Sequence, residues 1–258
     1  MNKTNQTGPT TPVINAITMQ DVTASLKEGV ADFFHAPLYG IFFGGIYTIA
    51  GLLILASLNL LDMRWMIIPI AVAFPFSGPF IAVGLYEISR RRAAGIPLKW
   101  KEILLVIIAQ REGQFGLMAF AIMCIFWIWI AQVRLLMALF LGFGSFSSVW
   151  SFIEVVTTTP EGLGFLALGS TIGAILAFVL FSATVVAIPL LLDREIDVVT
   201  AIITSFQSVF KNPVVMISWG LMVAILIIIA LLPLFFGIII VLPILGHATW
   251  HLFEKVIE

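Results

Sequence analysis

The chain has 258 residues, of which 61% are hydrophobic and only 10% are charged, a composition that fits an integral membrane protein and excludes an ordinary soluble domain. The 13 Lys and Arg residues nearly cancel the 14 Asp and Glu residues, so there is no excess positive charge with which to bind nucleic acid. The one cysteine, Cys124, excludes an internal disulfide and a Cys-x-x-Cys metal site.

The N-terminal residues 1–16 are polar and are predicted to be disordered. No short apolar stretch with a small-residue cleavage site follows them, so we expect no signal peptide. The first long apolar run begins near Leu38 and is predicted to be a retained transmembrane segment. We therefore expect the N-terminus to stay in the cytoplasm.

Six apolar stretches approach the roughly 20 residues that a helix needs to cross the hydrocarbon core of a bilayer. They are 38 to 59, 65 to 88, 115 to 136, 164 to 192, 214 to 232 and 234 to 253. The last two form an almost uninterrupted apolar run that can also be one long helix, and Pro233 and Gly237 favour a break between them. Six spans place both termini on the same side of the membrane.

The distribution of basic residues gives an independent indication of the topology. Every Lys and Arg except Arg64 and Arg134 falls on the same side as the N-terminus in this scheme. Because Lys and Arg accumulate in cytoplasmic loops, both termini are predicted to be cytoplasmic. Arg134 lies near the outer end of the third span, where Glu154 and Glu161 of the following loop are candidate partners.

A repeat relates the two ends of the chain at an offset of 176 residues, which aligns Pro37 with Pro213. An apolar stripe with helical spacing precedes each proline. The stripes are Val22, Leu26, Val30, Phe33 and Phe34 in the first copy, and Val198, Ile202, Phe206, Val209 and Phe210 in the second. Polar residues, among them Asp32, Thr204 and Ser208, are expected on the opposite faces, so both segments are predicted to be amphipathic helices in the membrane interface.

A similar stripe precedes the third span. It consists of Trp100, Ile103, Leu104, Ile107 and Ile108. We therefore predict an all-α polytopic membrane protein with six transmembrane helices in three hairpins, each preceded by an interfacial amphipathic helix. The three units are 17–92, 97–195 and 196–258, and together they form one membrane domain.

Three segments carry a resemblance to a known family. They are Pro243–His251, with the sequence PILGHATWH; Phe76–Pro79 followed by Tyr86–Arg90; and Pro189–Asp193. Together they resemble the bacterial integral-membrane family called domain of unknown function 2189, over nearly the whole chain. The names of some members link them to cytochrome c oxidase. The resemblance implies a bacterial inner-membrane protein in a respiratory context.

Histidines are the residues best suited to bind a metal ion. His247 and His251 are four residues apart, so on a helix they share a face and are spaced to hold a metal ion or to approach a haem edge. His35 and Glu87 are expected near the same membrane surface and are further candidate ligands. Imidazoles at helix ends more often bond to carbonyls or to neighbouring helices. The sequence therefore favours structural histidines and no cofactor, with metal or haem binding as the alternative.

A basic run follows the predicted second span. Its members are Arg90, Arg91, Arg92, Lys99 and Lys101. Such a run is first a determinant of topology, and it is also expected to attract anionic lipid headgroups.

No catalytic motif is present in the sequence, and the middles of the six spans lack charged residues that would mark an ion pathway. We therefore expect no enzyme. The leading hypothesis is an accessory subunit or assembly factor of a respiratory complex such as cytochrome c oxidase, with lipids and other membrane proteins as partners. The alternative is a transporter or channel for a small or amphipathic substrate, suggested by the repeat and by Pro69, Pro75 and Pro79 in the second span. The third is metal or haem handling through His247 and His251.

Overall fold

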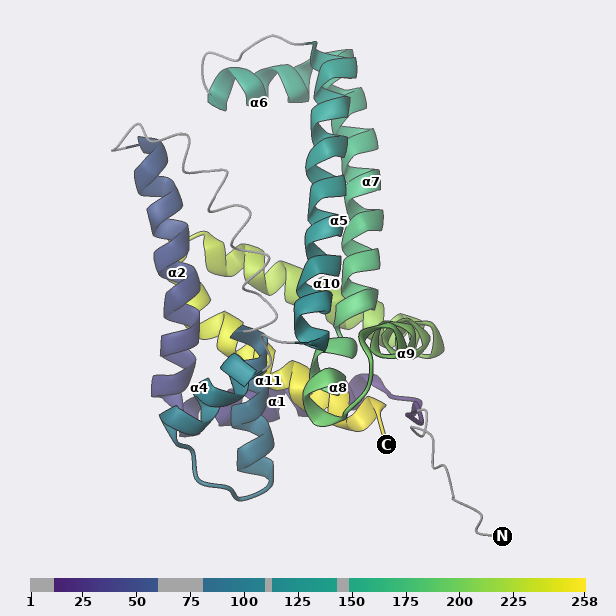
Figure 1. The fold of residues 1–258 in the computed structure, drawn as a ribbon. Coiled ribbons are helices and arrows are strands. Elements are labelled where there is room, and N and C mark those ends of the chain that lie inside the picture. The colour runs from purple at the N-terminus through teal and green to yellow at the C-terminus, as the bar shows by residue number, and fades with distance from the viewer. Residues whose placement is uncertain (1–11, 60–80, 110–112, 143–148) are drawn as a thin grey trace. The chain divides into compact units, whose positions relative to one another are not determined.

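The computed structural model describes residues 12–59, 81–109, 113–142 and 149–258, and the regular secondary structure in these ranges is helical (Figure 1). The helices are α1 Met19–His35, α2 Pro37–Asn59, α4 Trp100–Ala109, α5 Gln114–Leu136, the π-helix Met137–Leu141, α6 Val149–Thr158, α7 Pro160–Thr184, α8 Ala187–Asp193, α9 Val198–Lys211, α10 Pro213–Leu231 and α11 Ile238–Val256. Residues 81–93 form a further helix, here called the 81–93 helix. The all-α fold class is confirmed.

Three helical segments within the described residues are long and apolar enough to cross a membrane. They are Gln114–Leu141, Pro160–Asp193 and Pro213–Leu231. The pair Met19–His35 and Pro37–Leu53 also qualifies when taken together, although a bend of 100° separates its two parts. Three to four segments thus have the length and composition of a span, and the six spans in three hairpins stay a prediction. Most of the predicted span 65 to 88, with its three prolines, lies outside the described residues.

The corners between α1 and α2 and between α9 and α10 have nearly the same backbone geometry. Ala36 has φ −133° and ψ 52°, and Asn212, which is 176 residues further along, has φ −123° and ψ 51°. In both corners the amide N–H of this residue donates to the carbonyl four residues earlier. The physical cause is the proline that follows, because it disfavours helical geometry in the preceding residue and begins the next helix. The sequence offset of the repeat therefore relates two equivalent local structures.

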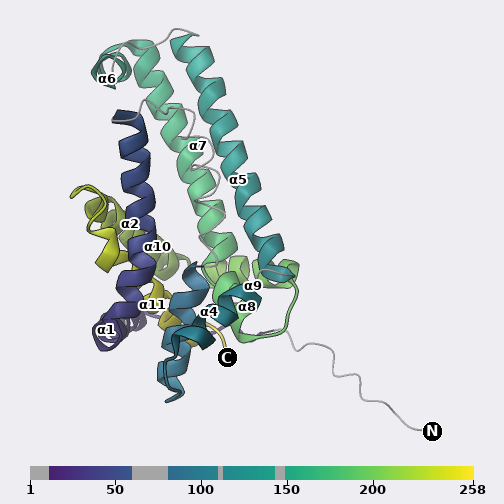
Figure 2. The same ribbon diagram turned by 60° about the vertical axis from the view of Figure 1, so that its left-hand side comes forward.

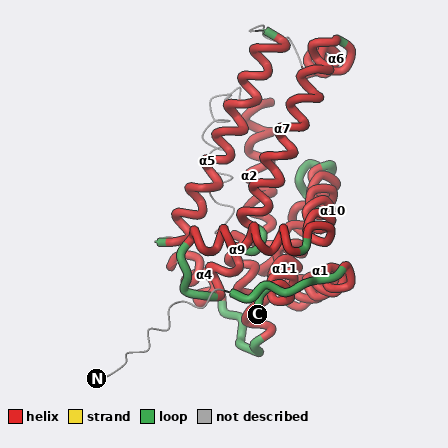
Figure 3. The backbone as a smooth tube through the Cα atoms, turned by 90° about the vertical axis from the view of Figure 1, so that its right-hand side faces the viewer, coloured by secondary structure: helices red, strands yellow, loops and turns green. Residues whose placement is uncertain are grey.

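The chain divides into two compact units, of which the first comprises residues 1–119 and 182–258. In this unit α11 packs against α1 and α2, and Figure 3 shows α11 alongside α1. Glycines allow the close approach. A Cβ atom on Gly29 would lie 2.6 Å from the backbone nitrogen of Ala248, and one on Gly44 would lie 2.7 Å from the carbonyl oxygen of Ile239. Small residues at such positions are typical of helix packing in membranes.

A tight turn separates α10 from α11. Leu234 and Phe235 have φ values of 50° and 67°, which residues other than glycine rarely adopt. The Thr48 hydroxyl of α2 donates to the Phe235 carbonyl at 3.1 Å, so the turn is also held by a neighbouring helix. The break predicted at Pro233 is confirmed, and residues 214 to 253 are two helices rather than one.

The interfacial helices differ from the prediction in the faces that they bury. Asp32 is only 6% exposed, and Thr204 and Ser208 of α9 are also buried. By contrast, Phe34 is 69% exposed and its counterpart Phe210 is 65% exposed. Sequence periodicity separates polar from apolar faces but does not say which face meets protein. Here each buried face combines small and polar residues with part of the apolar stripe, such as Phe33 and Val209, while Phe34 and Phe210 point outward, as is suitable for contact with lipid.

The start of the described chain is more ordered than the sequence indicates. Disorder is predicted up to residue 16, yet the Asn15 amide donates to the Val256 carbonyl at 2.7 Å, and the Glu258 amide donates to the Val13 carbonyl at 3.0 Å. The Asn212 side chain accepts from the Ile17 amide at 2.9 Å. Polar residues become ordered here because their backbone groups pair with the C-terminal end of the chain. Residues 1–11 lie outside the described residues.

The second compact unit comprises residues 120–181. Within it α5 and α7 lie side by side, as Figure 2 shows from a second direction. Gly164 of α7 faces the ring of Phe140, which would lie 2.6 Å from an added Cβ, and Gly169 faces Leu136. No ion pair joins Arg134 to Glu154 or Glu161 in the described part of this unit. The pairing suggested by the sequence is therefore not formed.

Candidate functional site

A cluster of polar and charged side chains lies in the first unit, where α1, the 81–93 helix and α11 meet. Asp32 of α1 is at its centre. Arg92 Nη1 donates to Asp32 Oδ1 at 2.6 Å, and His251 Nε2 lies 2.9 Å from Asp32 Oδ2. Ser89 Oγ lies 2.8 Å from His247 Nδ1, and both of these residues are completely buried. We call these five residues the Asp32 cluster.

The first copy of the repeated corner places Asp32 in the cluster. Asp32 lies on the last turn of α1, one position before Phe33 in the predicted apolar stripe, and it faces α11 because Gly29, one turn earlier, lets the two helices approach closely. His247 and His251 are one turn apart on α11 and reach different partners. The Asp32 cluster therefore connects three helices that are far apart in sequence.

Electrostatics stabilise the ionised forms of Asp32 and His251. The Asp32 carboxylate is buried, and its contacts with Arg92 and His251 compensate for the hydration that it loses. Burial would lower the pKa of His251, but its contacts with Asp32 and Glu254 raise the pKa to about 9. His251 lies near the C-terminal end of α11, which is not among the helices that qualify as spans. His251 is thus a cation at neutral pH, and its charge is matched by Asp32.

A second ionic group continues along the same side of the 81–93 helix. Glu87 is completely buried and pairs with Arg90 at 2.7 Å and with Arg91 at 2.6 Å. Arg91 also pairs with Glu102 of α4, and Lys99 lies 2.9 Å from the same carboxylate. These pairs attach α4 to the 81–93 helix.

The basic run predicted to contact lipid headgroups is therefore largely paired within the protein. Arg90, Arg91, Arg92 and Lys99 all have carboxylate partners. Lys101 has no such partner among the described residues. Contact of this run with lipid headgroups stays a prediction, with Lys101 as its one uncompensated charge within the described ranges.

The four candidate metal ligands are not brought together in one place. His247 contacts Ser89, and His251 contacts Asp32 and Glu254. His35 is exposed and bonds to the Ala31 carbonyl, and Glu87 belongs to the arginine pairs. Within the described ranges no group of three or more His, Cys, Asp or Glu side chains could hold a metal ion. Metal or haem binding stays a hypothesis that rests on the histidine spacing alone.

Sequence reasoning did not identify Asp32 or Ser89 as members of a site. Asp32 was expected on the solvent side of an amphipathic helix, and Ser89 has no motif around it. A signal was nevertheless present, because the repeat aligns Asp32 with Ser208, and an acidic residue at a position where the other copy has a small polar one indicates a specific partner. The partners are Arg92 and His251, and only the fold brings them to Asp32.

The arrangement can fix helices and hold a proton, but it does not present a reactive group. Ser89 and His247 have no exposed surface, so a substrate has no access to them in this conformation. Outside the cluster, the more exposed Lys255 of α11 pairs with Glu28 of α1 at 2.8 Å and donates to Ser25 at 3.0 Å. The chemistry of the site is thus charge pairing between α1 and α11.

Comparison with known proteins gives one match. Residues 67–193 match the model of a family described as predicted integral membrane protein (DUF2189). This range includes the 81–93 helix with Glu87, Ser89 and the arginines, and it extends to the end of α8. No curated protein and no solved structure gives a significant match to the chain.

Proposed function

We propose that this chain, which belongs over residues 67–193 to the DUF2189 family of predicted integral membrane proteins, is a non-catalytic component of a larger membrane complex. Its role is that of an accessory subunit or assembly factor of a respiratory enzyme such as cytochrome c oxidase. The chain resides in the inner membrane of a bacterium and uses no cofactor. Its partners are lipids and other integral membrane proteins.

One observation carries the non-catalytic part of this proposal. The buried carboxylate and histidine side chains among the described residues are Asp32, Glu87 and His247, and each is bonded to another side chain of the same chain. Enzymes and ion pumps keep perturbed ionisable groups accessible to substrate or water. Here these groups join helices instead, which favours a structural role.

Outward-facing apolar side chains support association within the membrane. Trp127 and Trp129 of α5 are 56% and 50% exposed, and Phe120 is 65% exposed. In a bilayer such side chains contact lipid or the helices of other membrane proteins. The respiratory assignment itself rests on the family resemblance.

The proposed topology has six spans in three hairpins, with units 17–92, 97–195 and 196–258 and with both termini in the cytoplasm. It is supported by the distribution of Lys and Arg and by the matching corners at Ala36 and Asn212. A test uses single cysteines in a Cys124→Ser background and a membrane-impermeant maleimide on intact spheroplasts. We expect Glu154→Cys to be labelled and Lys101→Cys to be protected until the membrane is opened. The opposite pattern would reject the orientation.

The test of the accessory role is gentle detergent extraction of the tagged protein from native membranes, followed by a native gel and mass spectrometry. We expect respiratory subunits to co-migrate at a fixed stoichiometry. An unrelated inner-membrane protein with the same tag is the control for non-specific capture. A strain lacking the protein is expected to contain less assembled oxidase, and the wild-type copy should restore it. Migration alone, together with unchanged oxidase levels, would reject the role.

A second candidate function is transport of a small or amphipathic substrate. The observation that favours it is the recurrence of one corner geometry at an offset of 176 residues, because many transporters are built from internal repeats. Substrate-dependent flux into proteoliposomes would support it. Sealed vesicles that take up no candidate substrate would count against it.

A further inference from the structure

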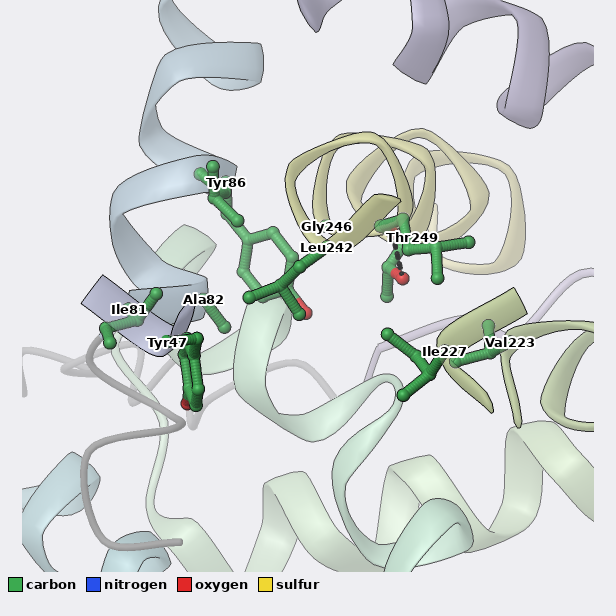
Figure 4. Close-up of a pocket in the computed structure, with 11 residues that line it drawn as sticks. Tyr47, Ile81, Ala82, Tyr86, Val223, Ile227, Leu242, Gly246 and Thr249 are labelled. Atoms are coloured by element: carbon green, nitrogen blue, oxygen red, sulfur yellow. Dashed lines mark hydrogen bonds between the residues drawn. The ribbon is translucent and has the colours of Figure 1, made fainter. Parts of the chain in front are cut away.

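A small cavity lies within the first unit between α2, the 81–93 helix, α10 and α11 (Figure 4). Its volume is about 220 Å³. Most of its wall is aliphatic, with Leu85 from the 81–93 helix, Val223 and Ile227 from α10, and Leu242 from α11. Among the described residues, no Asp, Glu, Lys, Arg or His side chain lines it. A charged ligand would therefore lose its hydration without compensation, and a neutral one is favoured.

Polar groups at the wall differ in whether they have partners. The Thr249 hydroxyl donates to the carbonyl of Leu245 at 2.7 Å, as the dashed line in Figure 4 marks. Tyr86 is only 6% exposed, and its hydroxyl has no hydrogen-bond partner among the described residues. Figure 4 shows the Tyr86 ring extending from its helix into the cavity with the hydroxyl at its inner end. The site therefore combines an apolar volume with one free donor.

The Tyr86 hydroxyl is not among the fully buried unpaired groups of the described residues, so a small molecule in the cavity can reach it. A ligand oxygen can therefore accept its hydrogen bond. The nearby Trp250 ring, whose centroid is 6.1 Å from that of Tyr86, keeps the phenol in place. The donor is thus held in position before any ligand arrives, which favours binding.

We propose that this cavity binds a neutral apolar molecule whose carbonyl oxygen accepts a hydrogen bond from Tyr86. An apolar cavity of about 150 Å³ accommodates a benzene ring, so the larger volume here, about 220 Å³, fits a small ring system of one or two fused rings or a short length of acyl chain. Two sources supply this chemistry: a membrane-dissolved ketone or quinone, and the ester of a membrane lipid. The inference does not depend on the accessory role, because a protein that migrates alone can still bind such a ligand.

The test measures saturable binding of radiolabelled 2-methyl-1,4-naphthoquinone to the purified, delipidated full-length protein in detergent. Tyr86→Phe removes only the hydroxyl and leaves no buried partner unpaired, so it should fold normally. It is expected to weaken binding by about 3- to 10-fold, since a hydrogen bond contributes a net 0.5–1.5 kcal/mol and tenfold corresponds to about 1.4 kcal/mol.

A second pair of variants tests the cavity itself. Ile227→Trp places a larger side chain in the cavity and should abolish saturable binding. Ile228→Trp makes the same change on the adjacent residue, which is 60% exposed and does not line the cavity, and it should bind like the wild type. A folded Ile227→Trp variant, confirmed by its elution from gel filtration, that still binds would overturn the proposal. Tyr86→Phe with unchanged affinity would also overturn the assigned hydrogen bond.

Lipid analysis distinguishes the two sources. If the naphthoquinone does not bind saturably, the lipids that co-purify with the protein before delipidation are identified by mass spectrometry. They show whether a lipid ester occupies the cavity instead. Phospholipid that is retained by the wild type and by Ile228→Trp, but is lost from Ile227→Trp and reduced in Tyr86→Phe, assigns the site to a lipid ester. Absence of both saturable naphthoquinone binding and variant-sensitive lipid would refute the site.

Discussion

Replacement of Asp32 by Asn removes the negative charge at the centre of the Asp32 cluster and leaves the shape of the side chain almost unchanged. Two contacts are lost: the 2.6 Å pair with Arg92 and the 2.9 Å contact with His251. The Asp32 side chain is 8% exposed, that of His251 is 12% exposed and that of Arg92 is 24% exposed. The change therefore leaves Arg92 without its carboxylate partner and leaves His251 with only the more exposed Glu254 and Glu28 as anionic neighbours among the described residues.

Removal of one partner from a buried pair costs about 3–5 kcal/mol. Because Arg92 retains access to solvent, we expect a smaller loss for Asp32→Asn, of about 2–4 kcal/mol. For a chain of this size such a loss lowers the melting temperature by roughly 5–15 °C. The measurement is thermal unfolding of the purified protein in detergent at pH 7, followed by tryptophan fluorescence.

The matched control is Glu195→Gln, which makes the same chemical change at an exposed carboxylate that forms no ion pair in the described structure. A double mutant with His251→Gln adds a test of coupling. Because Asp32 and His251 share one interaction, the combined loss should be smaller than the sum of the two single losses. The reasoning is refuted if Asp32→Asn melts within a degree or two of Glu195→Gln.

Three further predictions concern His251, Gly44 and Asn212. Burial alone would lower the pKa of His251, but its contacts with Asp32 and Glu254 raise the pKa from 6.5 to about 9. The protonated imidazole therefore stabilises the folded state fully below pH 6.5, and this stabilisation is lost as the pH rises through 9. The melting temperature should fall across this window, and His251→Gln should flatten the slope. Gly44→Ala places a Cβ atom 2.7 Å from the Ile239 carbonyl oxygen and should destabilise by about 1–3 kcal/mol, whereas Gly45→Ala, with nothing within 4 Å, should not. Asn212→Ala leaves the buried Ile17 amide without its acceptor, so the melting temperature should fall. Limited proteolysis should also remove the N-terminal segment faster. An unchanged cleavage rate would contradict the role of Asn212 in holding this segment.

The amino-acid sequence by itself determined the class of the protein and the boundaries of several of its helices. Composition and apolar length predict membrane helices, and α5 and α10 begin and end within one residue of the predicted spans. Pro37, Pro213 and Pro233 mark the corners and the break because proline restricts the backbone locally, whatever the rest of the fold does. The two corners 176 residues apart follow from the same local cause.

Only the tertiary structure decided which face of each interfacial helix meets protein and which ionic groups pair. A periodic pattern separates apolar from polar faces, but in a membrane the apolar face can point to lipid and the polar face to a neighbouring helix. Asp32 therefore turned out to be buried, and the arginines after Ser89 are paired rather than free. His247 and His251 share a helix face, as their spacing predicts, yet their partners come from α1 and the 81–93 helix. Those partners depend on how distant segments pack, and no local pattern contains that information.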